Sequence, residues 1–136
     1  MRIRSAHAHE SSRIAEIHAQ TAIAAYAHIF PDQPFPRAET ETRWREFAGQ
    51  ILVAVDDEII VGFVAFDARE LHALYVLPSH QGGGVGARLL EKAGEVKLLW
   101  VLRENHAARR FYEAQGWMAD GQERSAFGVI EILYCR

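Results

Sequence analysis

The strongest constraint on the fold of this chain is a glycine-rich segment between an apolar run and a helical pattern. Four glycines fall within five residues, at Gly82, Gly83, Gly84 and Gly86. Residues 71–78 before them are mostly apolar and predict a strand, and Arg88 to Ala93 predict a helix. Glycine lets the backbone approach a ligand closely, and the N–H groups at a helix start favour phosphate. The segment therefore predicts a phosphate-binding loop between a strand and a helix.

Two standard phosphate motifs fit this loop poorly. It lacks the lysine and hydroxyl residue of G-x-x-x-x-G-K-[ST], which disfavours magnesium–nucleotide chemistry. Gly82, Gly84 and Gly86 do not complete G-x-G-x-x-G, because Leu89 stands three residues beyond Gly86. The strand before the loop also follows a predicted hairpin instead of opening a βαβ unit. A different nucleotide, or a tight turn without a ligand, remains an alternative.

Length and composition predict one domain spanning residues 1–136. The chain is 49% hydrophobic and 24% charged, with a net charge of −3 and a pI near 6.1. This balance disfavours nucleic-acid binding and agrees with a cationic or amine substrate. Cys135 is the only cysteine, so no internal disulfide forms. Residues 1–5 lack the apolar core of a signal peptide, and no apolar run approaches the ~18 residues of a membrane span. We expect a cytoplasmic protein that does not enter a membrane.

The hydrophobic periodicities predict the element order β-α-α-β-β-β-α-β-α-β-β. The expected strands cover residues 2–5, 51–55, 59–66, 70–77, 97–102, 117–123 and 128–134. The expected helices cover residues 10–30, 38–48, 83–95 and 105–115. Such an order indicates an α/β or α+β fold with a mixed, largely antiparallel central sheet flanked by helices.

A second motif follows the next predicted strand and discriminates between the possible phosphate ligands. The segment 105–117 reads N-H-A-A-R-R-F-Y-E-A-Q-G-W. Together with Gln81, Gly84 and Gly86, this segment resembles the GNAT family of N-acetyltransferases, whose motifs are [Q/R]-x-x-G-x-[G/A] and N-x-x-A-x-x-F-Y-x-x-x-G-[F/W]. The family's Leu-Tyr-Val-x-Pro signature is matched by residues 74–78. The expected element order agrees with the family along the whole chain.

The resemblance implies a GNAT-type fold that binds acetyl-CoA as cosubstrate and needs no metal. In this family the strand before the loop pairs with the pantetheine arm and splays from the next strand, leaving a cleft for the thioester. The implied cofactor-binding residues are Leu74, Tyr75, Val76, Gln81, Gly82, Gly83, Gly84, Val85, Gly86, Ala87, Asn105 and Ala108. Asn105 also stands where a helix N-cap is expected.

The resemblance assigns Tyr112 as the phenol that assists the departing thiolate, against the alternative that it only packs in the core. Some relatives carry a catalytic glutamate at the position of Glu70. Strict alternation places Glu70 on one strand face with His72, Leu74 and Val76. Glu70 is therefore the first candidate base for the acceptor amine, with His72 or a water relay as alternatives. A non-catalytic acyl-CoA sensor would need neither Tyr112 nor Glu70.

Relatives often form homodimers through the last hairpin. In this fold acceptor specificity comes from the segments that correspond to Tyr26–Trp44 and Glu123–Gly128. Side chains that suit an amine pocket are the aromatics Phe30, Phe35 and Trp44 and the carboxylates Asp32, Glu39 and Glu41. The seven histidines show no metal-ligand spacing, and Cys135 is expected to be buried. The helix after the glycine loop is shorter than in many relatives.

Overall fold

The computed structural model describes residues 1–28, 34–126 and 128–136. The helices are α1 (Ser11–Tyr26), α2 (Arg37–Arg45), α3 (Val85–Lys92) and α4 (His106–Ala114), with 3₁₀ turns η1 (Ala8–Glu10) and η2 (Pro78–His80). The strands are β1 (Arg2–Ser5), β2 (Gln50–Asp56), β3 (Ile59–Phe66), β4 (Glu70–Val76), β5 (Leu98–Leu102), β6 (Met118–Ala126) and β7 (Val129–Cys135). The predicted order of helices and strands is confirmed. The predicted end of the first helix, near Phe30, lies outside the described residues.

The strands form one sheet in the order β1-β2-β3-β4-β5-β7-β6. Every neighbouring pair is antiparallel except β4 and β5, which run parallel. The predicted mixed, largely antiparallel sheet is therefore confirmed. The one parallel pair arises because α3 connects β4 to β5, and a crossover of this kind returns the chain in the same direction.

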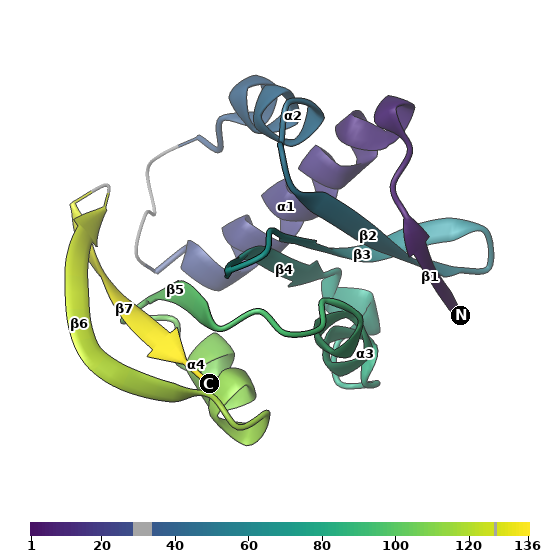
Figure 1. Ribbon diagram of the computed structural model, residues 1–136. Coiled ribbons are helices and arrows are strands. Elements are labelled where there is room, and N and C mark those ends of the chain that lie inside the picture. The colour runs from purple at the N-terminus through teal and green to yellow at the C-terminus, as the bar shows by residue number, and fades with distance from the viewer. Residues whose placement is uncertain (29–33, 127) are drawn as a thin grey trace.

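Helices cover both faces of the sheet. Figure 1 shows α1 and α2 on one side and α3 and α4 on the other. Apolar side chains repeat at helical spacing on α1, where Ile14 and Ile17 are buried. On α3, Val85, Leu89 and Leu90 form the buried stripe. Each helix thus covers a sheet face because its sequence gives it one apolar side.

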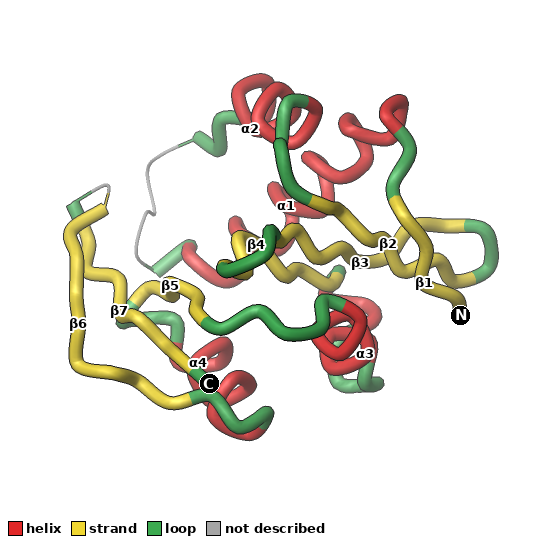
Figure 2. Tube along the Cα trace, in the orientation of Figure 1, coloured by secondary structure: helices red, strands yellow, loops and turns green. Residues whose placement is uncertain are grey.

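Helix α3 is short and begins at a glycine with a left-handed backbone. Gly84 is its N-cap, with φ of +87°, a conformation that favours glycine over any residue with a Cβ. The helix has 8 residues and ends at Lys92. Figure 2 shows the long connection that follows it before β5. The helix is therefore shorter than the predicted range 83–95, because residues 93–95 lie outside it.

Candidate active site

The predicted phosphate loop lies at the carboxyl end of β4. The Gln81 side chain donates a hydrogen bond to the Val76 carbonyl at 2.8 Å and so ties the loop to the strand. Gly84 offers no side chain to cap α3, so the N–H groups of the first turn have no partner from that position. The space beside Gly82, Gly83 and Gly84 is open to at least 4 Å where a Cβ would stand. The loop thus combines free donors with room for an anion.

Strands β4 and β5 separate after a very short pairing. Their register includes only Glu70 with Leu98 and Leu71 with Leu99. From residue 72 onward, β4 keeps its partner β3 and has no β5 residue in register on its other side. The predicted cofactor residues Leu74, Tyr75 and Val76 lie on this open segment. Backbone groups along such an edge can pair with an extended amide chain.

The side chains of β4 do not follow the strict alternation expected from the sequence. Ala65 and Phe66 of β3 face Ala73 and Leu71, so His72 is the extra residue of a β-bulge. Tyr75 stacks on His18 of α1 with ring centroids 4.4 Å apart, whereas Val76 lies near Gly62 and Gly86 on the α3 side.

The ring of His72 lies on the Tyr75 side of the sheet. It forms a T-shaped contact with the ring of Phe47, with centroids 5.2 Å apart, and Phe47 packs on Trp44 of α2. The prediction that His72 shares a face with Val76 is therefore wrong, because a bulge shifts the alternation by one residue.

Tyr112 lies on α4 with its side chain buried. Its ring contacts Phe111 and Trp117 with centroids 5.2 and 6.1 Å away. Burial, and secondarily the nearby phenol of Tyr26, raises the pKa of Tyr112 well above its ordinary value. The phenol therefore keeps its proton at neutral pH and is available as a hydrogen-bond donor.

Two further phenols lie near Tyr112. Tyr75 is a predicted cofactor-binding residue of β4, and Tyr26 begins the predicted acceptor segment, but no proximity of either phenol to Tyr112 was predicted. Burial raises the pKa of Tyr75 well above its ordinary value, and the adjacent phenol of Tyr26 adds to the effect.

Asn105 connects this group of phenols to α4. Its amide nitrogen donates to the Tyr26 hydroxyl at 3.4 Å, and its oxygen accepts from the Ala108 N–H at 3.2 Å. The predicted N-cap role of Asn105 is confirmed, and the predicted residues Asn105 and Ala108 lie in contact.

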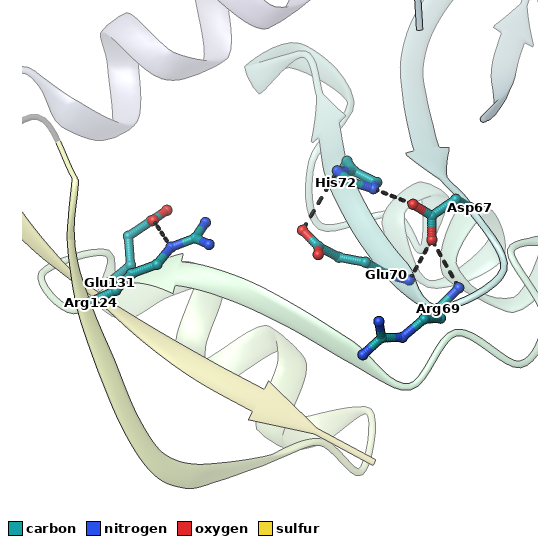
Figure 3. A network of polar contacts seen from close by, with 6 residues as sticks. All are labelled: Asp67, Arg69, Glu70, His72, Arg124 and Glu131. Atoms are coloured by element: carbon teal, nitrogen blue, oxygen red, sulfur yellow. Dashed lines mark hydrogen bonds and ion pairs between the residues drawn. The ribbon is translucent and has the colours of Figure 1, made fainter. Parts of the chain in front are cut away.

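A polar cluster occupies the amino end of β4, where the strands begin to separate (Figure 3). Nε2 of His72 lies 2.7 Å from Oδ2 of Asp67, and Nδ1 of His72 lies 3.5 Å from Oε2 of Glu70. The other Asp67 oxygen accepts from the backbone N–H groups of Arg69 and Glu70, each at 2.8 Å. The hydrogen bond from His72 and then those from the two backbone groups lower the pKa of Asp67 to about 2.

The predicted candidates Glu70 and His72 are therefore brought together, and Asp67 is the residue that sequence reasoning missed. The short turn Asp67-Ala68-Arg69 signals an aspartate that accepts from the next backbone N–H groups. Nothing in the sequence places that aspartate against His72, because the contact depends on the bulge.

The predicted acceptor residues divide into core and surface. Trp44 is buried and donates from Nε1 to Nδ1 of His18 at 3.0 Å, and Phe35 meets the edge of the His18 ring. Glu41 pairs with Arg45 at 3.5 Å, and Glu39 is exposed. Phe30 and Asp32 lie outside the described residues. Across the open segment, Arg124 of β6 pairs with Glu131 of β7 (Figure 3). The Arg124 guanidinium also lies over the ring of Trp100 of β5.

The remaining predictions concern Cys135, metal binding and membrane-spanning helices. Cys135 is partly exposed, with Sγ 3.9 Å from an Asp120 oxygen, so the prediction that it is buried is wrong. It is the last residue of β7, which lies between β5 and the edge strand β6. Within residues 1–28, 34–126 and 128–136, no group of three His, Cys, Asp or Glu side chains is placed to hold a metal. None of the helices described there is both long and apolar enough to cross a membrane.

A family model described as "Acetyltransferase (GNAT) domain" matches residues 48–119. This match covers more than half of the chain, from the start of β2 to the start of β6. The chain belongs to the GNAT acetyltransferase family. The match includes both motifs on which the family resemblance rests.

Known proteins similar to this GNAT chain agree with the assignment. An "Uncharacterized N-acetyltransferase" of Archaeoglobus fulgidus is 43% identical over 84 residues, which cover 48% of this chain and 57% of that relative. This chain thus matches little more than half the length of the archaeal protein. The L-amino acid N-acyltransferase MnaT of Escherichia coli is 28% identical over 90% of this chain and 82% of its own.

The fold is also that of a solved GNAT structure. The PaiA N-acetyltransferase of Thermoplasma acidophilum, in complex with coenzyme A, superposes with a TM-score of 0.75. The match covers 99% of this chain and 98% of that one at 18% identity, so it shows the fold alone.

Proposed function

We propose that residues 1–136 act as one domain, an N-acetyltransferase that transfers the acetyl group of acetyl-CoA to an amine. The observation that carries the proposal is the open edge of β4, which joins an uncapped glycine loop at one end to paired acid–base side chains at the other. In this reading residues 81–87 bind the pyrophosphate and Leu74 to Val76 pair with the pantetheine arm. Asn105 and Ala108 of α4 complete the cofactor side.

Bound acetyl-CoA supplies an activated acetyl thioester, and the chain supplies the proton transfers. Tyr112 keeps its proton in its buried position and donates it, or a hydrogen bond, toward the leaving sulfur. The acceptor amine attacks directly in a ternary complex and must lose a proton. We assign that proton to Glu70, with His72 as the alternative base.

Distance along β4 favours a water relay to this base. Tyr75, beside Tyr112, stands three residues from His72, which is about 10 Å at the ~3.3 Å rise of a strand. A proton released between these points would travel through water before reaching Glu70 or His72.

Two other functions fit parts of the site. An acyl-CoA sensor would use the glycine loop but not the Asp67–His72–Glu70 contacts or the buried Tyr112 phenol. A protein that binds another nucleotide would use the loop without the open β4 edge. We also infer that the protein is cytoplasmic and that it binds neither nucleic acid nor membranes. A homodimer would form through the β6–β7 hairpin.

Two measurements test the proposal. Thermal shifts with acetyl-CoA, ATP and NAD identify the ligand, because a ligand that binds the native state raises the melting temperature. Stabilisation by ATP or NAD alone would overturn the donor assignment. Release of free thiol from acetyl-CoA over a panel of amino acids, polyamines, aminoglycosides and peptide N-termini then tests catalysis. Binding without thiol release on any amine would favour the sensor.

A further inference from the structure

The contacts around His72 define the protonation of its two ring nitrogens. Asp67 has its pKa lowered to about 2, so its carboxylate is ionised and only accepts hydrogen bonds. At 2.7 Å from Asp67 Oδ2, Nε2 of His72 must therefore carry the hydrogen. In the neutral ring Nδ1 is then the bare nitrogen, and it faces Glu70.

The other side of the imidazole is arranged to receive a proton. Nδ1 of His72 and Oε2 of Glu70 are both acceptors, and their separation of 3.5 Å is longer than a hydrogen bond. Two lone pairs that face each other in this way repel. A proton arriving between them converts the repulsion into a charge-assisted hydrogen bond.

The backbone holds this arrangement in place from two directions. Asp67 Oδ1 is fixed by the N–H groups of Arg69 and Glu70, so the aspartate that orients His72 is itself anchored to the start of β4. The bulge turns His72 to the Tyr75 face, where its ring packs against Phe47 in a T-shaped contact. Figure 3 shows the Arg69 guanidinium directed away from the His72 ring.

The cluster also provides a route to solvent. The exposed side-chain fraction rises from 24% for His72 to 29% for Glu70 and 46% for Asp67. Protons that reach the pair can therefore leave to water after each turnover.

We propose that Asp67 is a positioning residue that fixes the tautomer of His72, so that His72 Nδ1 and Glu70 jointly receive the proton of the acceptor amine. The proposal rests on the proposed acetyltransferase function and replaces a single base with a shared one. Asp67 itself touches no reacting atom.

Asp67→Asn tests the proposal without removing the turn. The Asn oxygen still accepts from the two backbone N–H groups, which leaves its NH₂ group facing Nε2 of His72. Nε2 must then be the acceptor and Nδ1 must carry the hydrogen, which points at Glu70. The tautomer is reversed and the proton-accepting position is blocked. The matched control is Asp57→Asn, which removes the same charge from an exposed turn. Asp57 has φ of 52°, a backbone conformation that asparagine tolerates well.

The first readout is the ¹⁵N spectrum of the His72 ring near neutral pH. We expect the Nε2–H form in the natural protein and in Asp57→Asn, and the Nδ1–H form in Asp67→Asn. An Nδ1–H ring in the natural protein would overturn the proposal. This measurement needs no acceptor, so its outcome does not depend on whether acetyl transfer is found. A failure to find acetyl transfer would instead contradict the proposed function.

The second readout is kinetic. Asp67→Asn should lower kcat about tenfold with an unchanged Kd for acetyl-CoA and should shift the acid limb of kcat/KM to lower pH. Because Asp67 acts through His72, the same change should alter kcat by less than about twofold in a His72→Gln background. Equal losses in both backgrounds, or kinetics matching Asp57→Asn, would contradict a positioning role.

Discussion

The two ends of β4 are built in different ways. At the carboxyl end, residues 81–84 and the first turn of α3 form one continuous segment, and the proposed function uses its backbone N–H groups. At the amino end, a turn and a bulge bring together the side chains of Asp67, Glu70 and His72, to which we assign the proton transfer. The carboxyl end therefore depends on backbone conformation, and the amino end depends on side-chain chemistry.

This difference teaches how to separate the two functions. Backbone binding is damaged by adding a side chain, which should change cofactor affinity. Side-chain proton transfer is damaged by an isosteric change, which should alter kcat and leave affinity intact. Tyr112 lies on α4 near Tyr75, but its proposed role is proton transfer by a side chain, so it should behave as the amino end does.

The largest effect is expected at Tyr112. Tyr112→Phe should lower kcat by about 10²–10³-fold, the usual size of a lost general acid, because only the phenolic proton is removed. The Kd for acetyl-CoA should stay within about twofold, since the backbone loop is untouched. Steady-state kinetics and calorimetry measure the two quantities.

Tyr134→Phe is the matched control for Tyr112→Phe. It also removes a hydroxyl from a buried ring, one that donates to Glu113 at 2.6 Å. It should cost about 1 kcal/mol of unfolding free energy with normal kcat. A normal kcat for Tyr112→Phe would remove Tyr112 from the mechanism.

The next effect concerns the glycine loop. Gly84→Val places a branched side chain at φ of +87° and fills the open space beside the loop. We expect about 30-fold weaker acetyl-CoA binding, equivalent to roughly 2 kcal/mol, measured by calorimetry.

Gly121→Val separates strain from binding. Gly121 has φ of +94° and similarly open surroundings in β6, so it should lose similar stability but keep its affinity. If both variants bind acetyl-CoA equally well, the loop does not hold the phosphates.

A smaller effect is expected at the amino end of β4. Glu70→Gln should lower kcat about tenfold, below the range for direct general bases, because His72 still accepts part of the proton. Acetyl-CoA affinity should not change. The control is Glu95→Gln, which makes the same carboxylate-to-carboxamide change at an exposed residue after α3. A loss in affinity rather than kcat would show that the two ends of β4 are not separable.

The smallest effect at neutral pH concerns His18, which stacks on Tyr75 near the carboxyl end of β4. Burial lowers the pKa of His18 from 6.5 to about 4. The unfolded chain therefore binds a proton before the folded one does. The stability linked to His18 is fully present above pH 6.5 and is lost as the pH falls toward 4.

His18→Gln keeps an acceptor for Trp44 but does not titrate. The decrease in unfolding free energy between pH 7 and pH 4.5 should be smaller in this variant by on the order of 2 kcal/mol, as urea titrations would measure. Glu10, whose pKa its Arg4 partner lowers from 4.5 to about 2, contributes below this window, so Glu10→Gln should keep the natural pH slope. An equal slope for His18→Gln would contradict the assignment.

Features carried by adjacent residues were predictable. The element order, the glycine loop and the Asn105 cap all follow from local sequence, whereas α3 ends at Lys92, before the predicted residue 95. The face on which His72 lies was predicted wrongly, because one extra residue in a strand reverses the side on which every later residue points. The partial exposure of Cys135 was also missed, since it depends on which parts of the fold cover the end of β7.

The sequence by itself determined the family and the position of the glycine loop, because glycine placement, helix caps and strand periodicity act over a few residues. Only the tertiary structure decided how the side chains of Asp67, Glu70 and His72 meet and which phenols surround Tyr112. Those contacts depend on the β3–β4 register and on the packing of α1 against β4. Register and packing are set by the whole core rather than by neighbouring residues.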